Sequence, residues 1–136
     1  MWEGDCSGYV RVFSLDSNNE ASTNGTWKQI GQDIIREAIG DEFRISVSIF
    51  DNGLTIAFGV QSQDIKNEDY LGHVQIYHLE DNSASWVQIR MDIDGDMAGD
   101  WSGTLVSLSA NGSVVAIKAP GAGIDDVQTG QVKVYS

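Results

Sequence analysis

The sequence predicts an all-β fold made of repeated four-stranded antiparallel units, and three observations lead to this prediction. Two Asn-Gly pairs stand between short apolar runs, and one apolar strand pattern occurs three times along the chain. The segments between these markers also align with each other, so that Trp27 falls on Trp86 at an offset of 59 residues. A fixed period of this size is typical of repeat architectures.

The pairs Asn52-Gly53 and Asn111-Gly112 each predict a hairpin with a two-residue turn. Asn-Gly between apolar runs favours a type I′ turn, because both central residues of that turn need a positive φ. Counting outward from the turns gives the strand partners in each copy: Val47 with Phe58, Ser48 with Ala57 and Ile49 with Ile56, then Val106 with Ile117, Ser107 with Ala116 and Leu108 with Val115. Each hairpin then has a bulky face and a Ser/Ala face, and we expect both faces to be buried between stacked sheets.

Another strand, with the pattern G-x-V-x-[VI]-[FY], occurs three times, and its last two copies each follow a hairpin. It begins at Gly8, Gly72 and Gly130, and in the first two cases a strand containing W-x-Q-I comes next. The unit is therefore a four-stranded meander of about 60 residues. We place the copies at about residues 8–71 and 72–129, with a third marker strand at residues 130–136, in a single domain spanning residues 1–136.

Four-stranded units in series predict the blades of a β-propeller, and a two-sheet β-sandwich is the alternative. A closed propeller typically has at least about four blades. The predicted strands here make the last two of one unit, one full unit and the first three of another. We therefore expect a fragment of a longer array, with a short chain that closes a ring by association as the rival. Unpaired edges and apolar faces at the two ends favour self-association.

The second copy carries the pattern W-x-Q-I…D-I…G-D-x-x-G…V-S-L-S-x-N-G…V-A-I-x-A-P…G-x-V-x-V-Y. This pattern resembles the FG-GAP-type propeller repeats of integrin alpha subunits. It is more similar still to long repeat arrays in uncharacterised proteins of microalgae and marine bacteria. The resemblance implies a propeller with an adhesive or scaffolding role, and an extracellular or cell-surface location.

Composition excludes several classes of partner. The formal net charge of −12 repels nucleic acid and anionic membranes. No apolar run approaches the length of about 18 residues that a membrane-spanning helix needs. The single cysteine, Cys6, excludes a disulfide within this chain and a cysteine-rich zinc site. The residues themselves leave the cellular compartment open.

A calcium site is the sharpest local hypothesis. The carboxylates of Asp92, Asp94, Asp96 and Asp100 stand at positions 1, 3, 5 and 9 of one segment. A hard cation that takes six to eight oxygens suits such spacing. Integrin repeats carry a similar D-x-D-x-D-G-x-x-D loop, although there it lies inside the hairpin. The alternative is an acidic connection between units, with no cofactor.

Three tryptophans are candidates for stacking on sugar rings, namely Trp27, Trp86 and Trp101. The first two occupy the same repeat position, and packing between units explains repeated aromatic residues equally well. His73 and His78 lie five residues apart on one strand and so point to opposite faces, which prevents joint chelation of one metal. No catalytic motif is recognisable, so we expect no enzyme.

Two functions follow from these observations. The first is a non-catalytic repeat module for protein–protein interaction, adhesion or scaffolding, with a protein partner or another copy of the chain. The second is a lectin-like domain that binds carbohydrate through the repeated tryptophans.

Overall fold

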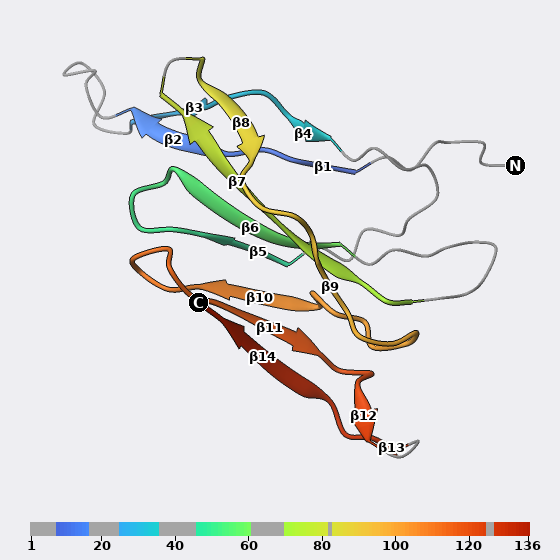
Figure 1. Cartoon of the computed structure of the whole chain (residues 1–136). Helices are drawn as coiled ribbons and strands as arrows, with labels where there is room; N and C mark the ends of the chain where they lie inside the picture. The colour runs from blue at the N-terminus through green and yellow to red at the C-terminus, as the bar shows by residue number, and fades with distance from the viewer. Residues whose placement is uncertain (1–7, 17–24, 36–45, 61–69, 82, 125–126) are drawn as a thin grey trace, which may run out of the picture.

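A computed structural model describes residues 8–16, 25–35, 46–60, 70–81, 83–124 and 127–136, and its regular elements are all β-strands. The strands lie in three groups, one above the other (Figure 1). The first group holds β1 (Tyr9–Val10) paired with β4 (Ile34–Ile35), and β2 (Phe13–Asp16) paired with β3 (Thr26–Gln29). The protein is therefore all-β, as predicted.

The middle sheet contains β5 (Val47–Ile49), β6 (Thr55–Val60), β7 (His73–Glu80) and β8 (Ser85–Gln88), each antiparallel to the next. This order is the predicted four-stranded meander. The short strand β9 (Ile93–Asp94) pairs with the beginning of β7, an addition that the sequence did not predict.

The third sheet has the order β10 (Leu105–Leu108), β11 (Val115–Ala119) and β14 (Gln131–Tyr135). A small hairpin of β12 (Gly123–Ile124) and β13 (Val127–Gln128) lies between β11 and β14 along the chain. Among the described residues, no helix is long and apolar enough to cross a membrane.

The predicted registers of the two hairpins are confirmed. The strand β5 pairs with β6, and β10 pairs with β11, through all six residue pairs counted outward from the Asn-Gly sites. The turns themselves differ from the prediction. Gly53 and Gly112 have φ values of +72° and +68°, whereas neither Asn52 nor Asn111 has a positive φ, so neither turn is of type I′.

Both hairpins instead close through the same longer turn. In the first, the amide of Gly53 donates to the Phe50 carbonyl, and the Asn52 side chain accepts from the Leu54 amide. The second repeats this pattern from the Gly112 amide to the Ser109 carbonyl. The asparagine is therefore used for its side-chain oxygen, which Asn readily offers to a nearby backbone amide.

The expected burial of both hairpin faces is wrong for Val47 and Ile49 of the first hairpin, and for the exposed Ser107 of the second. Ile56 and Phe58 are buried, but Val47 and Ile49 on the neighbouring strand are about half exposed. The cause is the position of β5 at the edge of its sheet, where the described part of the first group contributes no residue to cover it.

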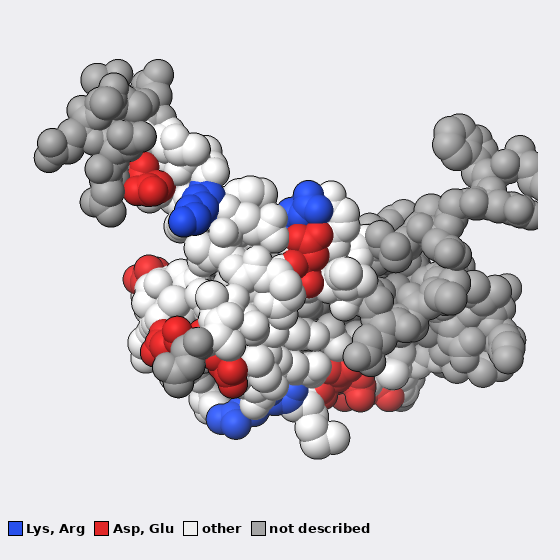
Figure 2. Space-filling model, turned by 90° about the horizontal axis from the view of Figure 1, so that it is seen from above, with Lys and Arg blue, Asp and Glu red and all other residues white. Residues whose placement is uncertain are grey.

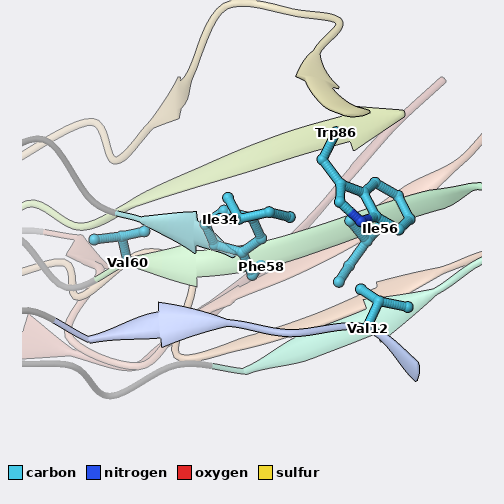
Figure 3. Packing of buried hydrophobic residues seen from close by; sticks show 6 residues of the cluster. All are labelled: Val12, Ile34, Ile56, Phe58, Val60 and Trp86. Atoms are coloured by element: carbon cyan, nitrogen blue, oxygen red, sulfur yellow. The ribbon is translucent and has the colours of Figure 1, made fainter. Parts of the chain in front are cut away.

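One apolar cluster joins the first group to the middle sheet. Its buried members come from both sides of this contact, and Figure 3 shows their side chains together: Val12, Ile34, Ile56, Phe58, Val60 and Trp86. The Phe58 ring stacks on Tyr77 with the ring centroids 5.4 Å apart. Burial of this apolar area is the main force that holds the two groups together.

A second cluster joins the middle sheet to the third sheet. Ala57 and Val74 of the middle sheet pack against the bulky face of the second hairpin, at Val106, Val115 and Ile117. The small Ser/Ala face of the first hairpin therefore lies under the second one, as expected. Ser48 also contributes, because its hydroxyl oxygen accepts a hydrogen bond of 2.9 Å from the Leu108 amide.

Glycines set the spacing of this second contact. A Cβ added at Gly59 would lie 1.8 Å from the Gly103 carbonyl oxygen, so the two backbones touch at this place. Only a residue without a side chain permits such an approach.

Candidate functional site

The outer face of the third sheet carries apolar side chains that no other described strand group covers. Val134 lies opposite Ala116, and Val132 lies opposite Lys118, so these side chains share one face of the sheet. The side chains of Val132 and Val134 are 67% and 66% exposed. Figure 1 places β14 at the margin of the molecule, with no labelled strand beyond it.

The same positions are covered in the middle sheet. There Val74 lies opposite Gly59, and Ile76 lies opposite Ala57. Val132 and Val134 of β14 pair with β11 in the same register. Val74 is fully buried beneath the second hairpin, and Ile76 packs against the same cluster. The outer face of the third sheet thus matches a surface that this chain already uses to bind a strand group.

The first group has an exposed outer face of a different kind. Phe13, Leu15 and Trp27 are each about half exposed or more, whereas the matching Tyr77, Leu79 and Trp86 belong to the first cluster. Seen from above, over β1 to β4, much of the described surface carries neither acidic nor basic groups (Figure 2). Both ends of the stack therefore expose apolar side chains at positions that are covered inside it.

The acidic segment of the calcium hypothesis has several partners within the chain. Asp100 is buried, and its carboxylate accepts hydrogen bonds from the amides of Asp96 and Met97. The Asp96 carboxylate pairs with Lys133, and this pairing raises the pKa of the lysine. Two of the four carboxylates are therefore engaged with other groups of the protein.

The remaining two carboxylates lie beside His73. Ligand atoms of His73, Asp92 and Asp94 all lie within 4.8 Å of one another. From the sequence, His73 was considered as a metal ligand only together with His78. Its grouping with Asp92 and Asp94 was not predicted, because the pairing of β7 with β9 was not predicted. The Asp92 carboxylate already accepts hydrogen bonds from Gln75 and Gln88, which gives it a structural role.

The first group shows the same structural use of an aspartate. The Gln29 side chain donates to Asp33 at 2.8 Å, as Gln88 donates to Asp92 at 2.6 Å. Arg11 adds two hydrogen bonds to Asp33, and these lower the pKa of that carboxyl group. Calcium binding in the second copy stays a prediction, and the measurement that checks it is the melting temperature with and without millimolar calcium.

The three candidate tryptophans have different environments. Trp86 is 3% exposed, and its indole Nε1 donates to the Ile30 carbonyl at 2.9 Å, so its ring faces have no room for a sugar. Trp27 is 66% exposed. Trp101 is 42% exposed, has a φ of +52° and meets the Tyr70 ring edge-on. Of these three candidates, Trp27 and Trp101 offer a ring to a ligand.

A groove of about 640 Å³ lies between the middle and third sheets at the end of β14. Apolar residues form much of its wall, among them Ile76, Ile89, Ile93, Leu108 and Tyr135. No sequence pattern predicts this groove, because residues from two sheets and a strand end form it jointly.

Compared with known protein families, with curated proteins and with solved structures, the chain matches none. The case for a function therefore depends on the geometry of this chain alone.

Proposed function

We propose that the chain is a non-catalytic repeat module that mediates protein–protein interaction by stacking strand groups of its own kind, in a propeller-type arrangement. The observation that carries this proposal is the exposure of Val132 and Val134 at positions where Val74 and Ile76 are covered by a neighbouring sheet. An apolar face of this kind favours a partner that presents a complementary bulky face.

The first group supplies such a face in another copy of the chain. Its outer residues Phe13, Leu15 and Trp27 match the side chains through which the middle sheet packs on its neighbour. One end of the stack would then bind the opposite end of a second copy. A head-to-tail contact of this type is heterologous, and it produces a ring or an open chain of subunits.

The test is the molecular mass in solution between low micromolar and about 100 micromolar protein, by sedimentation velocity or light scattering. Self-association should increase the mass with concentration. The double variant Val132→Glu and Val134→Lys should remain monomeric, because charged side chains on this face oppose its burial. Val127→Glu is the matched control, since Val127 is also exposed but lies on β13. A monomeric wild-type chain throughout this range would contradict the proposal.

A lectin-like function is the second candidate, because Trp27 and Trp101 have accessible rings. Aromatic faces stack on the apolar faces of sugars and bury substantial area in doing so. A titration of tryptophan fluorescence with a panel of mono- and oligosaccharides tests this candidate. The signal should saturate for the wild type and disappear in Trp27→Ala or Trp101→Ala. A flat response to every sugar would remove the lectin function.

A further inference from the structure

Among the described strands, β14 has a free edge where its counterpart β7 has strand partners. One edge of β7 pairs with β6, and the other pairs with β8 and β9. Among the described strands, β14 pairs with β11 alone. The groove of about 640 Å³ lies beside the end of this free edge, where Tyr135 and Ser136 line it.

The middle sheet shows what occupies the matching place. There Trp86 of β8 packs with Val12, Ile34 and Ile56, and it donates its indole hydrogen to the Ile30 carbonyl. The backbone of Trp86 is held as well, because Gln32 donates to its carbonyl and accepts from its amide, both at 2.9 Å.

The residues around Trp86 form its packing site, which we call the Trp86 seat. The wall of the groove has residues at the matching repeat positions. The Ile30 amide donates to the Val12 carbonyl at 2.9 Å, and the Ile89 amide donates to the Ile76 carbonyl at 3.0 Å. Ile89 and Ile76 both line the groove, so the wall has the backbone pairing that positions the Trp86 seat. Ile93 and Val115 complete the wall at the places of Ile34 and Ile56.

We infer that the β14 edge and the adjoining groove form a receptor for an added β-strand of another polypeptide that carries the pattern W-x-Q-I-x-x-D-I. This inference deepens the proposed function, because it names the kind of segment that the third sheet accepts. Addition of a strand to a free sheet edge gives affinity through the backbone and specificity through side-chain pockets.

The pairing of β7 sets the register of the added strand. Gln88 lies opposite Tyr77 and Ile93 opposite Val74, so the glutamine of the pattern meets Tyr135 and its last isoleucine meets Val132. The tryptophan, two residues before the glutamine, enters the groove against Ile76 and Ile89. The aspartate of the pattern lies beside Lys133, at the place where Asp33 meets Arg11 in the first group.

Two residues of the groove differ from the occupied seat. Arg90 stands in place of Gly31, and Met91 stands in place of Gln32. Met91 is 90% exposed and cannot make the paired hydrogen bonds that Gln32 makes with the backbone of Trp86. The groove should therefore bind an added strand less tightly than the first group binds the strand of Trp86. One substitution, at Met91, can restore the missing hydrogen bonds.

The experiment measures the binding of a fluorescein-labelled peptide with the sequence of residues 85–94, SWVQIRMDID, to the full chain by fluorescence anisotropy. We expect saturable binding, weakened about tenfold or more when the peptide tryptophan is replaced by alanine, because a buried aromatic side chain dominates such contacts. Ile89→Arg in the protein should weaken binding in the same way, whereas Val127→Arg, on the distant β13, should leave it unchanged.

A gain of affinity provides the sharper test. Met91→Gln restores both hydrogen bonds to the added strand, so it should tighten peptide binding by about threefold to tenfold. The control Met97→Gln changes another exposed methionine outside the groove and should have no effect. The inference would be overturned if neither replacement of the peptide tryptophan nor Ile89→Arg changed the affinity. An absence of peptide binding at 100 micromolar protein would also overturn it. Failure of the proposed self-association is distinguishable from failure of this inference, because it appears as a monomeric mass of the chain in the absence of peptide.

Discussion

Trp27 and Trp86 stand at the same position of the same sequence pattern, yet one is 66% exposed and the other 3% exposed. Their strands are similar, since β3 pairs with β2 as β8 pairs with β7. The difference comes from the neighbours, because the first group covers Trp86 and no other described strand group covers Trp27. The comparison shows that in this chain burial is a property of stacking between strand groups, and the local sequence pattern does not determine it.

The largest expected effect separates the two tryptophans directly. Trp86→Ala should lower the free energy of unfolding by about 3–5 kcal/mol, because it removes a large buried side chain and leaves a cavity. Trp27→Ala should change it by less than about 0.5 kcal/mol. Urea denaturation at low micromolar concentration measures both. Equal losses would mean that the first group does not cover Trp86 in solution.

A glycine beneath the buried ring provides the second prediction. A Cβ at Gly31 would lie 2.5 Å from Cδ1 of Trp86, and Gly31 has a φ of +71°. Gly31→Ala should therefore cost about 2–4 kcal/mol, from backbone strain together with overpacking.

Gly53→Ala is the matched control for that substitution. Its φ is +72°, but no atom lies within 4 Å of an added Cβ, so it should cost about 1 kcal/mol from the backbone alone. If both variants lost the same stability, the contact with Trp86 would contribute nothing.

The third prediction concerns the hydrogen bonds that hold Trp86. Gln32→Ala removes the donor and the acceptor that bind the backbone of Trp86, so it should cost about 1–2 kcal/mol. Gln128→Ala removes an exposed glutamine on β13 and should be neutral within about 0.5 kcal/mol. A neutral Gln32→Ala would show that the ring alone fixes this strand.

The smallest effect depends on pH. Hydrogen bonds from Arg11 lower the folded-state pKa of Asp33, so this pair stabilises the fold above the unfolded pKa of about 4 and loses its contribution as the pH falls. Arg11→Gln should lower the melting temperature slightly at pH 7, and the difference from wild type should shrink as the pH falls below about 4.

The middle sheet gives the reverse experiment. Gln75→Arg places a guanidinium near Asp92, at the site that matches Arg11, and should raise the melting temperature slightly at pH 7. Both effects are small because exposed ion pairs contribute little. A difference in melting temperature that stays constant as the pH is lowered would show that the side-chain stem acts through packing instead of charge.

The sequence was sufficient for the strand pairing of the two hairpins, because alternating apolar residues around Asn-Gly fix which residues lie opposite each other. It did not determine the turn. A two-residue turn and the observed longer turn give the same register, and only the backbone at Asn52 and Asn111 separates them.

Burial and the candidate site were predicted less well, for a shared reason. The exposure of Val47 and the closeness of His73 to Asp92 depend on residues far away along the chain. A hairpin pattern predicts which side chains share a face, but it does not predict whether another sheet covers that face. The groove beside β14 was not predicted for the same reason.

The hydrogen bond from the Leu108 amide to the Ser48 hydroxyl has a consequence for dynamics. This amide lies on β10 but bonds to a side chain of another sheet, 60 residues earlier in the chain. Its exchange with solvent deuterium therefore reports the separation of the middle and third sheets, even while the hairpin of β10 and β11 stays intact. Amides that bond within that hairpin report its own opening, so two neighbouring positions on one strand register two distinct breathing motions of the molecule.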